Sequence, residues 1–228
     1  MKLLAIETAT TACSAALSVS GEVRQRFEIA PRRHAELLLP MIGELLAEAG
    51  LSPMQLDAVA FGRGPGAFTG VRIAAACAQG IGFGADVPVV PVSTLAILAQ
   101  GAARTGHGPL IMAAMDARVR EVYAGAYRSD EPPVVIPCGP ETVCAPGDVT
   151  LPPGAGPWFG VGDAWTAYGE ELRGLFVTAL AGFDAGRCPE ARDAAMLGIH
   201  IYRNGGAVPA EQALPVYLRD RVATPKRS

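Results

Sequence analysis

The sequence has no long apolar run and no large excess of charge of either sign. Its 228 residues include 19 Lys and Arg against 22 Asp and Glu, and only 6% are aromatic. A dedicated nucleic-acid-binding domain would usually carry a strongly basic face, so the net charge of −3 disfavours that class. The uncharged stretch 73–85 is shorter than the about 20 apolar residues of a membrane-spanning helix, and the stretch 87–103 is interrupted by Pro88 and Pro91. We therefore expect a cytoplasmic protein with no membrane segment.

Residue pairs that commonly hold metals are also lacking. The five cysteines form no C-x-x-C pair, and the three histidines form no H-x-x-x-H or H-E-x-x-H pair. No G-x-S-x-G sequence supports a nucleophilic serine. The sequence therefore predicts no metal ligands and no catalytic residues.

Half of the residues are apolar, which is enough for a substantial core. The first half predicts three strands, a helix, a strand, a helix, a strand and a helix. The expected positions are strands at 3–6, 13–19 and 23–29, a helix at 37–49, a strand at 57–61, a helix from about 70, a strand at 87–92 and a helix at 93–104. This order is typical of a ribonuclease-H-like domain with a mixed sheet and helices on its faces.

The second half begins as the first does. Strand 3–6 leads into Glu7, and the predicted strand 110–115 leads into Asp116, each before a turn and another strand. This similarity indicates an internal duplication. The segment 129–162 holds eight prolines and six glycines without Lys or Arg. We expect it to be mostly irregular, with short strands at 134–136 and 158–161, followed by helices at 163–172 and 189–203. The second half is therefore expected to be a degenerate copy.

A glycine-rich segment follows the predicted strand 57–61 and leads into a helix. Its residues of interest are Arg63, Gly64, Pro65, Gly66, Phe68, Thr69 and Gly70. Free backbone N–H groups at a helix start can bind an anion. The segment lacks the Lys-Ser/Thr of a Walker loop and the third glycine of G-x-G-x-x-G, so a turn and helix-start role is favoured over phosphate binding.

Glu7 and Asp116 would suit a two-lobed enzyme that binds Mg-ATP between its halves. The turns after such residues normally contain glycine, because the backbone must approach the phosphates closely. Here the turns read Thr8-Ala9-Thr10 and Ala117-Arg118-Val119. Their Cβ atoms would crowd the phosphates, so no bound cofactor is predicted.

Several segments resemble the TsaB (YeaZ) family. They are Leu3–Thr10 with Cys13–Leu17, His34–Pro40, Gly64–Arg72 with its pattern G-P-G-x-F-T-G-x-R, Asp116–Arg118 with Glu121–Tyr123, and Pro215–Arg219. The resemblance is dense over residues 1–127, weak from 129 to about 210, and present again at the end. It implies the duplicated actin-like ATPase (ribonuclease-H-like) fold. On this basis we expect a lobe at 1–104, a smaller degenerate lobe at 105–209, and a C-terminal segment at 210–228.

The resemblance also implies a function. Members of the family support formation of N6-threonylcarbamoyladenosine at position 37 of tRNAs that read A-starting codons. They bind a catalytic paralogue, TsaD, and the ATPase TsaE joins the assembly. ATP and metal are then expected on those partners, and tRNA is contacted indirectly through the complex. The paralogue's metal-binding histidine pair aligns with Thr94 and Leu98, neither of which replaces a histidine ligand.

Family members pack two helices against a partner in a four-helix bundle. The matching interface residues here are His34, Leu37, Leu38, Met41, Leu45, Arg72, Ala75 and Ala76. A homodimer is one expectation for the free protein. Two alternatives stay open: an active metallopeptidase or ATP-dependent phosphotransferase of the same fold, and direct tRNA contact by the basic tail 219–228.

Overall fold

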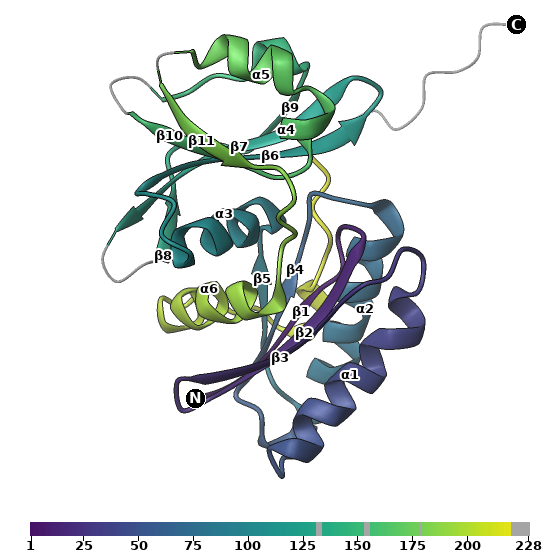
Figure 1. The fold of residues 1–228 in the computed structure, drawn as a ribbon. Coiled ribbons are helices and arrows are strands. Elements are labelled where there is room, and N and C mark those ends of the chain that lie inside the picture. The colour runs from purple at the N-terminus through teal and green to yellow at the C-terminus, as the bar shows by residue number, and fades with distance from the viewer. Residues whose placement is uncertain (131–133, 153–155, 178, 220–228) are drawn as a thin grey trace, which may run out of the picture.

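The computed structural model contains two lobes, each built on one β-sheet (Figure 1). It describes residues 1–130, 134–152, 156–177 and 179–219. The first sheet has the strand order β3-β2-β1-β4-β5. Its strands are β1 (Lys2–Glu7), β2 (Ala12–Val19), β3 (Glu22–Ile29), β4 (Ala58–Gly62) and β5 (Val89–Val92). Strands β1, β2 and β3 pair antiparallel, whereas β4 and β5 run parallel to β1.

The second sheet repeats this arrangement. Its order is β11-β10-β6-β7-β8, and β9 pairs with β7. The strands are β6 (Leu110–Arg118), β7 (Glu121–Asp130), β8 (Val134–Pro137), β9 (Thr142–Cys144), β10 (Trp158–Val161) and β11 (Leu180–Asp184). Again three strands pair antiparallel and two follow in parallel. The two sheets thus share one topology, which confirms the duplicated ribonuclease-H-like fold.

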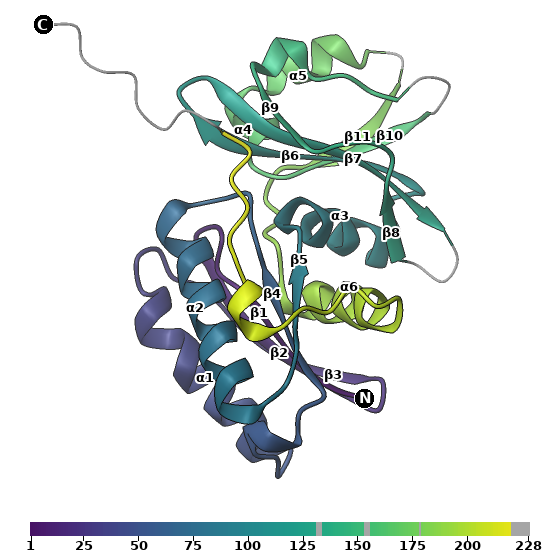
Figure 2. The same ribbon diagram turned by 180° about the vertical axis from the view of Figure 1, so that it is seen from behind.

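The helices form three layers around the sheets (Figures 1 and 2). Helices α1 (His34–Glu48) and α2 (Phe68–Ala85) cover the outer face of the first sheet, and the short helices α4 (Ala164–Ala167) and α5 (Gly169–Leu175) lie outside the second. Helices α3 (Thr94–Arg104) and α6 (Ala191–Arg203) lie between the sheets. Each crosses over: α3 packs on the second sheet, and α6 packs on the first.

Three apolar clusters follow from the alternation of side chains along the strands. In β1, Leu3 faces the inner cluster between the sheets, whereas Leu4 and Ile6 face the cluster under α1 and α2. The third cluster surrounds Trp158 and Trp165 outside the second sheet. Among the described residues, none of the helices combines the length and apolarity needed to cross a bilayer.

Most expected elements are present, with some differences. Helix α2 begins at Phe68 rather than Gly70, and the helix expected at 163–172 is interrupted at Tyr168. Strands β9 and β11 were not predicted. Strand β11 combines Gly182 with a weak alternation, and β9 has only three residues, so neither carries a clear strand pattern. The lobe boundaries remain a prediction, since α3 and α6 each pack across them.

Candidate functional site

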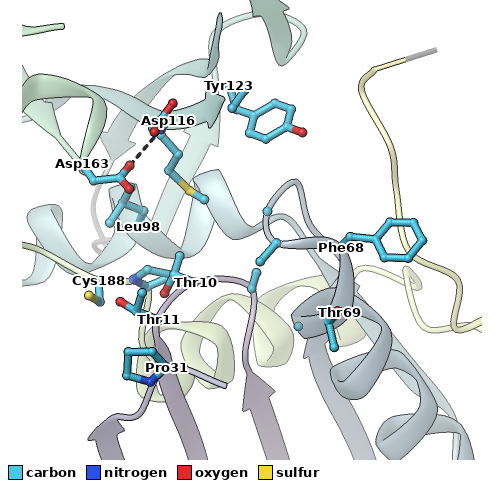
Figure 3. A pocket seen from close by; sticks show the side chains of 18 of the residues that line it. Thr10, Thr11, Pro31, Phe68, Thr69, Leu98, Asp116, Tyr123, Asp163 and Cys188 are labelled. Carbon is cyan, nitrogen blue, oxygen red and sulfur yellow. Dashed lines mark hydrogen bonds between the residues drawn. The ribbon is translucent and has the colours of Figure 1, made fainter. Parts of the chain in front are cut away.

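A cleft of about 1040 Å³ lies between the two lobes (Figure 3). The first lobe contributes the β1–β2 turn, with Thr10 and Thr11, and the start of α2, with Phe68 and Thr69. The second lobe contributes the end of β6, the β10–α4 turn and the connection into α6. The cleft thus lies between the first turns of the two repeats, and of the two acidic residues singled out in the sequence only Asp116 lines it.

The glycine-rich segment packs tightly against the β1–β2 turn. The Ala67 N–H donates to the Ala9 carbonyl at 2.7 Å, and the Thr8 hydroxyl donates to the Gly70 carbonyl at 2.8 Å. A Cβ at Gly66 would lie 2.5 Å from the Ala9 oxygen, and one at Gly70 would overlap the Thr8 carbonyl. These two glycines therefore allow backbone to meet backbone. Gly64 and Pro65 are also buried, whereas Phe68 and Thr69 are exposed at the start of α2.

Glu7 does not face the cleft. Its side chain is fully buried; one carboxylate oxygen accepts from the Ala9 N–H at 2.6 Å, and the other accepts from the Thr94 hydroxyl at 3.2 Å. Gly62 lies so close that a Cβ there would overlap this carboxylate. Burial raises the pKa of Glu7 to about 7, and the two hydrogen bonds partly oppose that rise. The carboxyl group is thus enclosed by its own lobe.

Asp116 lines the cleft, but its oxygens have partners within the second lobe. One oxygen accepts from the Arg118 N–H at 2.8 Å and from the Tyr168 hydroxyl at 3.1 Å, and the other pairs with the Arg118 guanidinium at 2.8 Å. The Asp116 N–H donates to Asp163 at 2.9 Å (Figure 3). Burial raises the pKa of Asp163. These contacts hold the turn after β6 in place without leaving a free pair of carboxylates.

No metal-binding cluster forms in the part of the chain that the structure describes: no three His, Cys, Asp or Glu side chains converge there. Thr94 is buried against Glu7, and Leu98 lines the cleft with an apolar side chain. His34 is buried, and its Nε2 lies 3.2 Å from the Ala12 carbonyl oxygen. The positions compared with a metal-binding pair thus serve packing and one internal hydrogen bond.

The predicted interface residues divide into a buried and an accessible group. The buried side chains, which pack within the first lobe, are those of His34, Leu38, Met41, Leu45 and Ala75. The accessible ones are Leu37, which is half-buried, together with Arg72 and Ala76. Leu39 on α1, which is 62% exposed, was not in the predicted set. The sequence could have suggested it, because the apolar residues of α1 exceed the single stripe needed for one core contact.

The outer face of α2 is lined by small residues. Ala76, Gly80 and Gly84 recur every four residues and are exposed. A Cβ added at Gly80 or Gly84 would meet nothing within 4 Å. Phe83 lies beside this stripe and is 62% exposed. A face of this kind allows a second helix to approach closely.

The C-terminal segment 213–219 runs from the first lobe to the second (Figure 2), and Tyr217 and Arg219 within it line the cleft. The Val216 N–H donates to the Arg63 carbonyl at 2.8 Å. Further along, the Arg219 guanidinium donates to the Ala117 carbonyl at 3.0 Å and pairs with Glu121, both in the second lobe. We call residues 213–219 the strap. The sequence did not predict these contacts. It showed only the family pattern at 215–219 within this segment. The tail beyond Arg219, where direct tRNA contact was one alternative, lies outside the described residues.

Comparison with known proteins gives consistent results. Residues 27–156 match the family model described as "TsaD: tRNA N6-adenosine threonylcarbamoyltransferase". The chain is 40% identical to the tRNA threonylcarbamoyladenosine biosynthesis protein TsaB of Escherichia coli, covering 99% of this chain and 98% of that protein. It is 39% identical to the protein of the same name from Haemophilus influenzae, covering 99% of this chain and 97% of the relative.

Solved structures agree with the sequence comparison. The structure described as YeaZ from Pseudomonas aeruginosa superposes with a TM-score of 0.89 at 45% identity, covering 95% of this chain and 99% of that one. The fold is therefore shared over nearly the whole length of the chain. The chain belongs to the TsaB (YeaZ) family.

Proposed function

We propose that this chain is a non-catalytic subunit required to form N6-threonylcarbamoyladenosine in tRNA, and that it acts by binding the catalytic paralogue TsaD. Full-length similarity to proteins named for the biosynthesis of this nucleoside supports the role. The enclosed carboxyl group of Glu7 is the observation that carries the non-catalytic part. A carboxylate that cannot reach the cleft cannot position a metal or polarise a substrate there.

The contacts around the cleft support the same conclusion. The glycine-rich segment is filled by the backbone of Thr8 and Ala9, so a phosphate could not take that space. Asp116 is occupied by Arg118 and Tyr168. The alternative of a metallopeptidase or phosphotransferase needs both acids to face a ligand, and this arrangement does not favour it. ATP and metal then belong on TsaD and the ATPase TsaE, and the assembly would work in the cytoplasm, where tRNA is modified.

The outer surface of α1 and α2 is the proposed contact with TsaD. The stripe of Ala76, Gly80 and Gly84 permits close helix approach, and Leu37 and Leu39 on α1 provide apolar area beside it. The buried members of the predicted set support this surface from beneath. In the absence of TsaD, a second copy of the chain could use the same helices, which gives the homodimer proposed for the free protein.

Reconstitution with purified components tests the function. Full tRNA threonylcarbamoylation should require this chain in addition to TsaD and TsaE, measured as modified nucleoside after digestion of the tRNA. The chain alone should bind no ATP by calorimetry. Complete modification by the other components without this chain would contradict the proposal.

The helix surface is tested by Gly80→Leu. A Cβ added there meets nothing within 4 Å, and leucine is a better helix former than glycine, so the monomer should remain folded. The leucine side chain should block the close approach of a partner helix. We therefore expect association with TsaD to weaken by at least about tenfold, which corresponds to about 1.4 kcal/mol. The matched control is Gly174→Leu on α5, where a Cβ also meets open space. Equal association of both variants, read by light scattering, would exclude α2 from the interface.

A further inference from the structure

Two exposed aromatic rings lie against the guanidinium of Arg72 at the mouth of the cleft. The Arg72 guanidinium carbon lies 3.3 Å from the ring centroid of Phe68 and 5.1 Å from that of Tyr217. The two rings are 6.3 Å apart and tilted by 34°. Phe68 is 60% exposed and Tyr217 46% exposed. We call Phe68, Arg72 and Tyr217 the aromatic platform.

The platform is fixed in place by the backbone around it. Phe68 and Arg72 lie one turn apart on α2, and an Arg72 Nη donates to the Phe68 carbonyl at 3.3 Å. Tyr217 is held because its neighbour Val216 bonds to Arg63 and Arg219 bonds to the second lobe. A third ring, that of Tyr123 on β7, points into the same cleft (Figure 3). Phe68 lies beside the strap in the same view. The rings therefore form a preorganised surface.

The chemistry of this surface matches an unpaired nucleobase. Bases that are not stacked in a helix are commonly bound on aromatic rings and arginine planes. Arg72 covers one face of Phe68, and the exposure of Phe68 leaves room for a flat group on the other. Because Phe68 and Tyr217 are about half exposed, these side chains contribute little to packing in the core.

Charge near the platform limits the contribution of phosphates. Of the four arginines that line the cleft, three pair with carboxylates: Arg118 with Asp116, Arg187 with Asp184, and Arg219 with Glu121. These carboxylates compensate most of the local positive charge. Stacking must then supply most of the affinity, which agrees with the net charge of −3 for the chain.

We propose that the aromatic platform binds an unpaired base in a single-stranded loop of RNA. This inference rests on the proposed function, because a tRNA-modifying assembly presents such loops to its subunits. It goes beyond that function by giving this chain a direct RNA contact of its own, in the part of the chain that precedes the tail.

The first test uses the full chain and a fluorescently labelled RNA hairpin with unpaired adenines in its loop. Phe68→Ala and Tyr217→Ala should each weaken binding by about tenfold, since one base–aromatic stack contributes about 1–3 kcal/mol. Phe68→Tyr should retain binding. The matched control is Phe83→Ala, at the far end of the same helix and equally exposed. Equal losses for the Phe68 and Phe83 variants would overturn the proposal.

Salt dependence and competition sharpen this test. With only one or two phosphates neutralised, affinity should fall by about three- to sevenfold between 50 and 200 mM salt, from a slope of about −0.7 per phosphate. A fall of a thousandfold would indicate a phosphate-binding surface and overturn the stacking proposal. The same RNA closed into a duplex should bind at least tenfold more weakly. Competition by free AMP as strong as by the loop would also overturn it.

The second test separates the RNA contact from the partner contact. In the complex reconstituted with TsaD, ultraviolet crosslinking to tRNA should label peptides that contain Phe68 or Tyr217; labelling elsewhere only would contradict the proposal. If Phe68→Ala weakens association with TsaD and leaves RNA binding unchanged, the platform is a protein interface and this inference fails while the proposed function stands. If modification proceeds fully without this chain, the proposed function fails first, whatever the RNA measurements show, and the inference that rests on it falls too.

Discussion

Glu7 is a carboxylic acid held in a fully buried position between β1, β4 and the start of α3. Burial raises its pKa from 4.5 to about 7. In the unfolded chain it ionises near 4.5, so between these two values the folded state binds more proton than the unfolded state. The free energy of unfolding therefore falls as pH rises through this window. Ionised Glu7 weakens the fold at neutral and alkaline pH, which is opposite to the effect of a salt-bridged acid.

Glu7→Gln tests this effect. The amide is nearly the same size, can still accept from the Ala9 N–H, and does not ionise. Relative to the variant, the native chain should lose up to about 3 kcal/mol of unfolding free energy between pH 4.5 and 7, from about 1.4 kcal/mol for each unit of a pKa difference of about 2.5. Urea unfolding of both proteins across pH 4 to 8 measures the difference. Parallel pH profiles would show that Glu7 does not titrate in this range.

At the residue scale, the sequence placed Glu7 correctly at the end of β1, whereas Asp116 lies within β6, which continues two residues further to Arg118. It could not show that Glu7 turns inward, because that depends on Gly62 and Thr94, which are distant in sequence. The prediction that phosphates would be crowded out rests on the non-glycine turns after both acids. The burial of Leu38, Met41 and Leu45 depends on which face of α1 meets the sheet, and their spacing alone left both faces available.

At the scale of elements, the β6–β7 hairpin stores strain in its backbone. Arg118, Val119 and Arg120 have φ angles of 65°, 55° and 56°. This left-handed conformation costs an L-residue about 1–2 kcal/mol and suits a β-branched side chain least. Val119 is 84% exposed, so packing returns little of that cost.

Val119→Asn should therefore stabilise the protein, because asparagine tolerates the left-handed region. We expect a gain of about 1 kcal/mol, or about 2–4 °C in melting temperature for a chain of this size. Val177→Asn is the control, since Val177 is also exposed but is not among the residues with positive φ. A melting temperature that does not rise above that of the control would show that the hairpin is unstrained in solution.

Elements with strong local patterns were predictable. Residues close together in the chain determine the alternation in β3 and the order of the elements along the sequence. They also determine the start of α3, where the Ser93 hydroxyl accepts from the Ala96 N–H. The strap and the aromatic platform were not, since Phe68 and Tyr217 lie far apart in sequence and meet only when the C-terminal segment packs beside α2. Short strands such as β9 depend on pairing with β7, which no local pattern encodes.

At the scale of the whole molecule, the sequence predicted two similar halves but not how they are joined. Helix α3 follows the first sheet in the chain and covers the second, whereas α6 follows the second and covers the first. A periodic apolar pattern shows that a helix has a buried face, but it does not say which sheet covers that face. The C-terminal strap adds a third connection between the halves.

The crossing of α3 and α6 has a consequence for how the protein loses its structure. When either sheet opens, it uncovers a helix that belongs in sequence to the other half, so neither half keeps a complete core. We expect a single unfolding transition in which the calorimetric and van't Hoff enthalpies agree. Two separate transitions would contradict this. Neither half should therefore fold on its own. A fragment ending near residue 104 would carry α3 with no sheet to cover and would leave the inner face of its own sheet open to water.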